Sequence, residues 1–397
     1  MRYTTTIERL SKLGDDKWSI YKRARELASQ GVDIIELAIG EPDVPTPNYL
    51  IEAAVDSLRS GRTGYSPGSG ETSLREALAR RYTVKAGRTI STQQILCFPG
   101  TQTALYAAVT AVAGKGDEII IGDPMYATYE GLVASTGAQI VEVPLIAENG
   151  FRIQAVDIEK RISARTTAIL INTPHNPTGA VLTGEDITEI GALARKHDLW
   201  LIVDEVYDEL IFHEATFSTP LSQLDLADRT IVVCSISKSH AAPGFRSGWC
   251  VAPESFCERI LPLSEAMLFG NQPFLADATA LAIANPSPIA AGMCVRFAAR
   301  ADRLATMLHS QTQLKVHTPD AGMFALVDVS STGLNGKDYA LDLLNNAGVG
   351  VMPGASFGRS LNKWVRVSLT ETDDIFDEGC RRIVAHANLK RRDHAGR

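Results

Sequence analysis

Short apolar segments alternate with amphipathic segments through the middle of the chain. The apolar segments predict strands, and they span 95–98, 118–122, 167–172, 200–203, 230–234 and 248–252. Helical spacing recurs between them, over 101–113, 126–135 and 185–197. Strands that are apolar on both sides are typical of a parallel sheet with helices on both faces. The alternation of the two patterns predicts an open α/β fold.

The pattern changes at about residue 287. A long helical stretch over 289–311 precedes a mixture of strands and helices, with strands at 323–329, 349–352 and 364–368 and helices at 338–346 and 374–388. This order predicts a second, smaller α+β domain. The first 45 residues fit neither pattern, and we expect them to join it. The predicted domains are therefore a large one at 46–286 and a small one made of 1–45 and 287–397.

Composition narrows the function classes. The chain has 397 residues, 45% of them hydrophobic, and a net charge of -7. An acidic balance argues against nucleic acid and anionic membranes as partners. There is neither an apolar stretch of membrane-spanning length nor an apolar signal-peptide core, so we expect a cytoplasmic location. Without C-x-x-C or H-x-x-x-H spacings, the six cysteines read as reduced thiols and no metal site is expected.

Polar residues follow three of the predicted strands. Asn172 and Asp204 close two of them, and Cys234 leads into SISKSHAAPGFRSGW at 235–249. In open α/β sheets ligands bind outside the carboxyl ends of the strands, so these residues can meet at one ligand. Asp204 follows an apolar run and is expected to be partly buried, where a carboxylate needs a partner. A helix N-cap is the alternative role for Asp204.

Lys238 and Arg246 suggest a specific cofactor. A partly desolvated lysine can form a Schiff base, and arginine offers phosphate a bidentate fork. The turn at Gly100, Thr101 and Gln102 opens a predicted helix and can bind an anion, although most βα turns look alike. Lysine, phosphate site and buried carboxylate together are what pyridoxal phosphate requires. The alternative is that Lys238 is an ordinary exposed lysine of a surface loop.

Two further glycine patterns do not carry chemistry. The segment 64–68 matches the G-x-S-x-G pattern of hydrolases, but no apolar strand precedes it and Pro67 indicates an irregular loop. Gly348-Val349-Gly350 lacks the third glycine and the βα context of a dinucleotide site.

Motifs in a fixed order extend over essentially the whole chain. They are GEPDVPTP at 40–47, YSPGSGETSLREAL at 65–78, PGTQTALY at 99–106, DPMYATY at 123–129, NTPHNPTG at 172–179, DEVYDEL at 204–210, SISKSHAAPGFRSGW at 235–249 and WVRVSL at 364–369. In these the chain resembles the class I/II aminotransferases of the aspartate aminotransferase superfamily. The resemblance implies the fold type I architecture, pyridoxal 5'-phosphate as cofactor, and a homodimer with shared active sites.

The resemblance also implies roles around the cofactor ring. Lys238 resembles the Schiff-base lysine that moves the proton, and Asp204 the partner of the pyridine nitrogen. Tyr207 and Asn176 are similar to the pair that binds the phenolic oxygen. Tyr126 takes the stacking position, where many relatives have Trp or Phe.

The remaining implied roles concern the phosphate and the substrate. Ser235 and Arg246 resemble phosphate ligands, with the Gly100–Gln102 turn beside them, and Tyr65 resembles a tyrosine that reaches the neighbouring subunit's phosphate. The substrate's α-carboxylate is expected at Arg366 and the backbone of Gly40, near Tyr126 and Asn176. Alternatives stay open: Asn172 and Asn176 as plain turn residues, Tyr65 as a loop aromatic, and Arg366 paired with a surface carboxylate.

The implied activity is transamination by two half-reactions between an amino acid and a 2-oxo acid. Within the superfamily the chain resembles most the arginine–pyruvate transaminases, in NGFRIQ at 149–154, SKSHA at 237–241 and PDAGMFALVDVSSTGL at 319–334. A guanidinium is bound by carboxylates or aromatic faces, for which Asp15, Asp16 and Trp18 are candidates. Exposed loop charges are the alternative for the two aspartates.

Other activities stay open. An aspartate or aromatic aminotransferase, or a C–S β-lyase, would use the same fold and cofactor. A cofactor-sensing regulator would need a DNA-binding domain, and the residues before the first motif show no basic helix-turn-helix.

Overall fold

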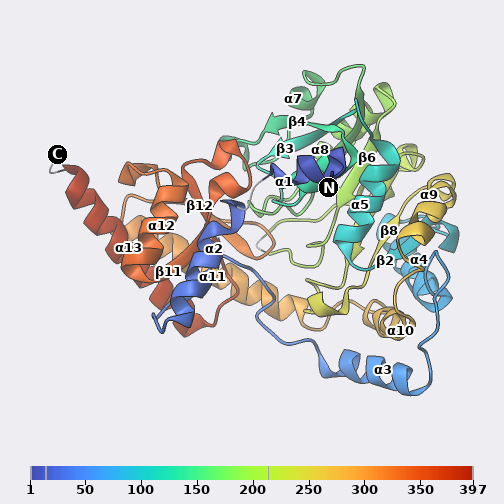
Figure 1. The fold of residues 1–397 in the computed structure, drawn as a ribbon, viewed down its shortest axis with the longest axis horizontal. Coiled ribbons are helices and arrows are strands. Elements are labelled where there is room, and N and C mark those ends of the chain that lie inside the picture. Colours follow the sequence, from blue (N-terminus) through green and yellow to red (C-terminus); the bar gives the residue numbers. More distant parts are fainter. Residues whose placement is uncertain (1, 14–15, 213, 396–397) are drawn as a thin grey trace.

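Two sheets organise the chain in the computed structural model, which describes residues 2–13, 16–212 and 214–395 (Figure 1). One sheet has seven strands in the order β2-β8-β7-β6-β5-β3-β4, and the other has five in the order β1-β11-β12-β10-β9. The strands are β1 Ile35–Leu37, β2 Ile95–Phe98, β3 Glu118–Asp123, β4 Gln139–Pro144, β5 Thr166–Asn172, β6 Trp200–Asp204, β7 Thr230–Ser235, β8 Gly248–Val251, β9 Lys315–His317, β10 Phe324–Asp328, β11 Val349–Pro353 and β12 Trp364–Ser368.

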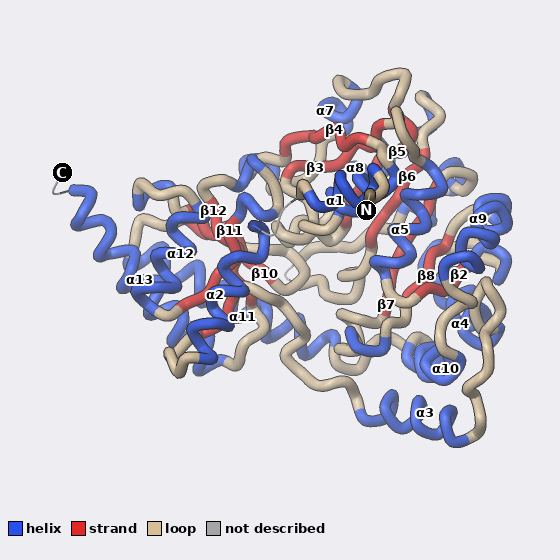
Figure 2. Tube along the Cα trace, in the orientation of Figure 1, coloured by secondary structure: helices blue, strands red, loops and turns tan. Residues whose placement is uncertain are grey.

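Helices surround both sheets (Figure 2). They are α1 Thr5–Ser11, α2 Ser19–Ser29, α3 Asn48–Arg59, α4 Thr72–Ala86, α5 Thr101–Val112, α6 Tyr129–Thr136, α7 Ala155–Glu159, α8 Gly184–Lys196, α9 Glu254–Met267, α10 Pro273–Ala282, α11 Ala290–Gln311, α12 Gly336–Ala347 and α13 Asp373–Ala395. In the described part of the chain, none of them is both long and apolar enough to cross a membrane.

The larger sheet is mostly parallel, as the sequence predicts. Strands β4, β3, β5, β6 and β7 pair in parallel, and only β8 runs antiparallel to its neighbours β7 and β2. Successive residues of β6 face opposite cores: Leu201 and Val203 share one with α8, and Ile202 shares the other with α5. Both faces are thus covered, which explains why these strands are apolar throughout.

The smaller sheet unites the two ends of the chain. β1 pairs in parallel with β11, with Ile35 opposite Val349, and α2 packs on β11. Figure 1 shows α2 beside α12 and β11, although more than 300 residues separate α2 from α12 in the sequence. The apolar faces of the smaller sheet and its helices form a core of their own, separate from the two cores of the larger sheet. The domain boundaries at residues 46 and 286 stay a prediction.

One predicted helix starts three residues too early. We expected it from residue 126, but α6 begins at Tyr129. The Met125 N–H donates to the Phe357 carbonyl at 2.8 Å, which holds this segment against a distant loop and keeps it out of the helix. Tyr126 therefore lies on a loop, where its side chain reaches the cavity described next.

Candidate active site

A cavity of about 230 Å³ lies at the carboxyl ends of β5, β6 and β7. It is lined by most of the predicted site residues: Gly40, Thr101, Gln102, Tyr126, Asn176, Asp204, Tyr207, Ser235, Lys238, Arg246 and Arg366. Gly100, which comes directly before Thr101 in the sequence, is not among the lining residues, and neither is Tyr65. Residues more than 300 positions apart thus meet at one place, as the rule for α/β sheets predicts.

Lys238 is the nucleophilic amine of the cavity. Its Nζ lies 3.5 Å from the carbonyl oxygen of Gly40, to which it donates. Burial lowers the pKa of Lys238 to about 8, an effect that Glu41 opposes and that Arg366 and Arg246 reinforce. An amine with this pKa is readily available in its neutral, nucleophilic form near neutral pH.

Asp204 is a buried carboxylate at the end of β6. The hydroxyl of Tyr129 donates to its Oδ2 at 2.8 Å, and the Val206 N–H donates to Oδ1 at 3.1 Å. Burial raises the pKa of Asp204 to about 6, although both hydrogen bonds favour the charged form. A cationic partner in the cavity would stabilise its charge.

An anion cradle forms where α5 begins. Its N-cap Gly100 has a φ of 86°, and a Cβ there would lie 2.3 Å from Nη2 of Arg246, so only glycine lets the guanidinium approach. The Thr101 hydroxyl is buried and has no hydrogen-bond partner among the described residues. Ser235 and Gln102 also line the cavity. A helix N-terminus, a guanidinium and an unpaired hydroxyl fit a phosphate group.

Arg366 is held between two aromatic rings. Its guanidinium lies 3.6 Å from the ring centre of Phe324 and 4.4 Å from that of Phe357. It donates to Asn176 Oδ1 at 2.9 Å and to the Ala38 carbonyl at 2.7 Å, while its buried Nε has no partner in the part of the chain that the structure describes. Burial lowers the pKa of Arg366 to about 10, which leaves it cationic at neutral pH.

The alternative in which Arg366 pairs with a surface carboxylate is therefore wrong. The side chain is buried, and no ion pair to it occurs within the described residues. Arg366 is shielded from bulk solvent but lines the cavity, and its Nε is free to donate there. It is therefore suited to binding an anionic group of the substrate.

Asn172 and Asn176 join neighbouring strand ends. Asn172 donates to the Asp204 carbonyl at 2.9 Å and accepts from the Asn176 N–H at 2.8 Å. The Asn176 amide donates to the Tyr207 hydroxyl at 3.4 Å, and burial raises the pKa of that hydroxyl further above its ordinary value. These contacts go beyond those of plain turn residues, because a continuous series of hydrogen bonds links the side chains of Arg366, Asn176 and Tyr207.

The four remaining predicted residues differ in where they lie. Tyr65 is 93% exposed, and its ring lies 5.9 Å from that of Phe269, which is also exposed. Trp18 lines the cavity. Asp15 and the side chain of Asp16 lie outside the described residues.

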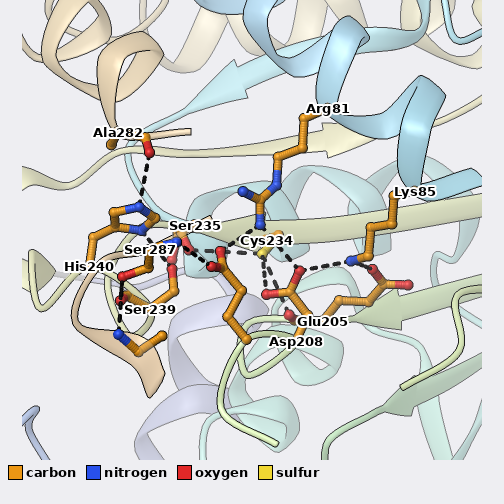
Figure 3. Close-up of polar contacts among 12 residues, drawn as sticks. Arg81, Lys85, Glu205, Asp208, Cys234, Ser235, Ser239, His240, Ala282 and Ser287 are labelled. Atoms are coloured by element: carbon orange, nitrogen blue, oxygen red, sulfur yellow. Dashed lines mark hydrogen bonds and ion pairs between the residues drawn. The ribbon is translucent and has the colours of Figure 1, made fainter. Parts of the chain in front are cut away.

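A buried ion cluster supports the loop behind Asp204. Figure 3 shows Lys85 and Arg81 pointing from α4 toward Glu205 and Asp208. Lys85 contacts Glu205 Oε2 at 2.8 Å and Asp208 Oδ2 at 2.7 Å, and Arg81 contacts Glu209 Oε1 at 2.5 Å. Every charge of this cluster has a partner of opposite sign, as buried charges require.

Sequence reasoning missed three aromatic residues of the site. Phe324 and Phe357 enclose Arg366, and Tyr129 holds Asp204. Phe324 and Tyr129 lie in segments of apolar character, so they looked like core residues. Tyr129 belongs to the motif at 123–129, which was the available signal.

Comparison with known proteins identifies the family. A family model described as aminotransferase class I and II matches residues 32–383. The arginine–pyruvate transaminase AruH of Pseudomonas aeruginosa is 39% identical over 384 residues, covering 97% of this chain and 98% of the relative. Aromatic-amino-acid aminotransferase 2 of Thermococcus litoralis is 32% identical over 359 residues, covering 89% and 92%.

Solved structures agree on the fold. A single mutant of Thermus thermophilus aspartate aminotransferase superposes with a TM-score of 0.92 at 28% identity, covering 97% of this chain and 100% of that structure. The aromatic aminotransferase of Pyrococcus horikoshii OT3 gives 0.87 at 30% identity, covering 93% and 99%. These similarities bear out the predicted fold type I architecture.

Proposed function

The chain belongs to the class I and II aminotransferase family, and we propose that the cavity around Lys238 is where it carries out its reaction. It is a pyridoxal-phosphate-dependent transaminase whose substrates are an amino acid and a 2-oxo acid. The observation that supports this location is the convergence of a depressed-pKa lysine, a buried carboxylate and an anion cradle. When bound, pyridoxal phosphate supplies an aldehyde for amines and a ring that accepts electrons from the substrate's Cα.

The residues of the cavity fit this cofactor. Arg246, Ser235, Thr101 and the N-terminus of α5 would hold the phosphate, since they form the cradle with an unpaired buried hydroxyl. Asp204 would bind the protonated ring nitrogen, and that cation would offset the cost of burying the carboxylate.

Three further side chains would fix the ring. Tyr126 would offer its face for stacking, while Asn176 and Tyr207 would donate hydrogen bonds to the phenolic oxygen.

Lys238 and Arg366 divide the work on the substrate. Lys238 Nζ, in its neutral form, would accept the proton from the substrate's Cα and would deliver it to the C4′ carbon of the cofactor, which then carries the amino group as an amine. Arg366 Nε and Nη, with the backbone of Gly40, hold the α-carboxylate and so orient the Cα–H bond. Phe324 and Phe357 exclude water around the guanidinium, which strengthens its attraction for the carboxylate.

We further propose arginine or another basic amino acid as donor and pyruvate as acceptor. The similarity to AruH supports this choice. A second cavity of about 400 Å³ shares Trp18 and Gln102 with the first, and Glu130 lines it. Glu130 Oε2 pairs with Lys17 at 2.5 Å, and the other oxygen can accept from a guanidinium whose stem packs on Trp18.

A panel of amino donors with pyruvate and 2-oxoglutarate tests the substrate. Arginine and lysine should react fastest with pyruvate, and Glu130→Gln should raise KM for arginine while leaving neutral donors unchanged. Glu142→Gln, at an exposed position of β4, is the matched control. If aspartate or phenylalanine reacts and arginine is inert, the basic-substrate proposal is wrong. Pyruvate released from a thioether amino acid without an acceptor would instead support the β-lyase.

Lys238→Ala tests the reaction site itself. The variant should lose transamination with every donor and also the visible absorbance band of the bound cofactor. A wild-type protein that develops no such band with added cofactor would contradict the proposed site.

A homodimer with shared sites is also proposed. The exposed aromatic pair of Tyr65 and Phe269 is its observed support, since exposed aromatic residues are enriched at interfaces. We retain the predicted cytoplasmic location, with which six free cysteines are consistent.

A further inference from the structure

Arg300 is a buried arginine of α11 that lies outside the cavity lining. Its Nη1 donates to Asp43 Oδ2 and to the Leu369 carbonyl, both at 2.9 Å. Its Nε donates to Asp373 Oδ1 at 2.8 Å. Only 3% of the side chain is exposed, so these three contacts account for a charge that the protein has removed from water.

Two of the three partners of Arg300 lie on the segments that would hold the substrate's α-carboxylate. Asp43 comes three residues after Gly40, and Leu369 comes three residues after Arg366. One guanidinium group therefore spans the N-terminal segment and the end of β12. Lysine could not reproduce this, because the planar fork of arginine gives its donors fixed directions.

The Asp43 end of the bridge is firmly held. Arg296 donates to both carboxylate oxygens of Asp43, at 2.6 and 2.7 Å. Despite burial, these hydrogen bonds and charges hold the pKa of Asp43 below its usual value, so it is ionised at neutral pH. Asp43 is consequently an anchor on which Arg300 can fix the segment that carries Gly40.

The Gly40 segment also has little room to move. A Cβ at Gly40 would lie 2.5 Å from the Phe324 ring, the same ring that stacks on Arg366. A shift of a few tenths of an ångström in this segment would therefore change the contact between Phe324 and the Arg366 guanidinium.

We propose that Arg300 is a positioning residue that sets the distance between the Gly40 backbone and the Arg366 guanidinium, and thereby the affinity for the α-carboxylate. The proposal rests on the roles proposed above for Gly40 and Arg366. Arg300→Met should weaken binding of carboxylate-bearing ligands roughly 10-fold or more, since small misplacements of binding groups have effects of this size. Ligands without the carboxylate should bind as before.

The experiment compares two ligands on the holoenzyme. α-Methylarginine carries the carboxylate but has no Cα proton to lose, and agmatine is the corresponding amine without the carboxylate. Their dissociation constants are measured from the absorbance change of the bound cofactor, so no turnover is needed. Arg300→Met should weaken α-methylarginine roughly 10-fold and change agmatine less than about threefold.

Arg303→Met is the matched control. Arg303 lies one helical turn away and donates to Asp373 and Asp377, but it contacts neither Asp43 nor Leu369. It should leave both ligands unchanged. If Arg300→Met does not fold, Asp43→Asn breaks the same bridge at its other end, and the same separation of the two ligands is expected. Equal weakening of both ligands, or of neither, overturns the proposal.

Arg366→Met separates this failure from that of the proposed function. If Arg366→Met also binds both ligands normally, the assignment of the α-carboxylate site is wrong and the role of Arg300 is overturned with it. If Arg366→Met loses only α-methylarginine while Arg300→Met loses neither, Arg300 alone is refuted. If arginine is not the donor, the α-methyl and decarboxylated forms of the active donor replace this pair.

Discussion

The hydroxyl of Tyr129 lies 2.8 Å from Oδ2 of Asp204, a carboxylate in the lining of the cavity. Burial nevertheless raises the pKa of Asp204 to about 6. In the protein without cofactor, this carboxylate is a charge that burial makes unfavourable at neutral pH. The ionised Asp204 carboxylate thus destabilises the fold until a cationic ring nitrogen binds next to it and stabilises its charge.

Asp204→Asn should therefore stabilise the cofactor-free protein. Asp204 has a pKa of about 6 when folded and close to 3.8 when unfolded, so the folded state binds more protons between these values. Wild-type stability should consequently fall by up to about 3 kcal/mol as pH rises from 4 to 7, a loss that the amide avoids. Thermal unfolding at both pH values measures this.

Asparagine is a matched replacement at this position. Its carbonyl can still accept from the Val206 N–H, and its amide can donate to the Tyr129 hydroxyl. Added cofactor should then stabilise the wild type more than the variant. A variant that is less stable than wild type at pH 7 without cofactor would contradict the argument.

Tyr129→Phe should weaken cofactor binding in a pH-dependent way. The Tyr129 hydrogen bond lowers the pKa of Asp204, so its loss raises that pKa and leaves less carboxylate ionised near pH 7. A hydrogen bond to a charged group predicts a loss of about 10-fold in affinity. Cofactor titrations should show the difference between variant and wild type widening as pH falls from 8.5 to 6.

Tyr126→Phe is the control for the lost hydroxyl. Tyr126 lies edge-on to Tyr129 with ring centres 5.6 Å apart, but no hydrogen bond joins its hydroxyl to Asp204 among the described residues. Its effect on cofactor affinity should not depend on pH over this range. A parallel pH dependence in both variants would refute the role given to the Tyr129 hydroxyl.

The sequence was most informative where chemistry interrupts an apolar pattern. Asp204 and Lys238 stand out because Asp204 ends a strand of apolar residues and Lys238 comes three residues after a mostly apolar strand. Phe324 gives no such signal, since an aromatic residue in an apolar strand looks like core whether it packs on leucine or on a guanidinium. Arg300 was also invisible, because an arginine within a helix is exposed in most proteins.

Local pattern likewise failed at the edge of the larger sheet. β4 was not predicted, because as an edge strand it mixes exposed, partly buried and buried residues and has no continuous apolar run. Its pairing with β3 supplies the order that its own sequence does not specify.

Lys85→Met should strongly destabilise the fold. The change leaves Glu205 and Asp208 buried without their shared cation, for which a cost of about 3–5 kcal/mol is usual. Burial already raises the pKa of Glu205, and Lys85 opposes that rise. Without Lys85 the folded state holds this proton more tightly, so the deficit should be larger at pH 8 than at pH 5. Denaturant unfolding of the holoenzyme at both pH values measures it.

Lys196→Met is the matched control for this cluster. Lys196 pairs with Glu159 on the surface, where both side chains are exposed to solvent. Its loss should cost less than about 1 kcal/mol at either pH. Equal effects of the two lysine substitutions would show that the cluster at Lys85 behaves as a surface ion pair.

Mixing two inactive variants tests whether Tyr65 acts across a dimer. Tyr65 is 93% exposed in its own chain, so a role at a phosphate requires a second copy. In a heterodimer of Lys238→Ala and Tyr65→Ala, one site would carry both defects and the other would carry none. Random reassociation of equal amounts should restore about a quarter of wild-type activity, because half of the dimers have one intact site. If Tyr65 acted within its own chain, neither site of the heterodimer would be intact, and mixing would add nothing to the residual activity of the parents.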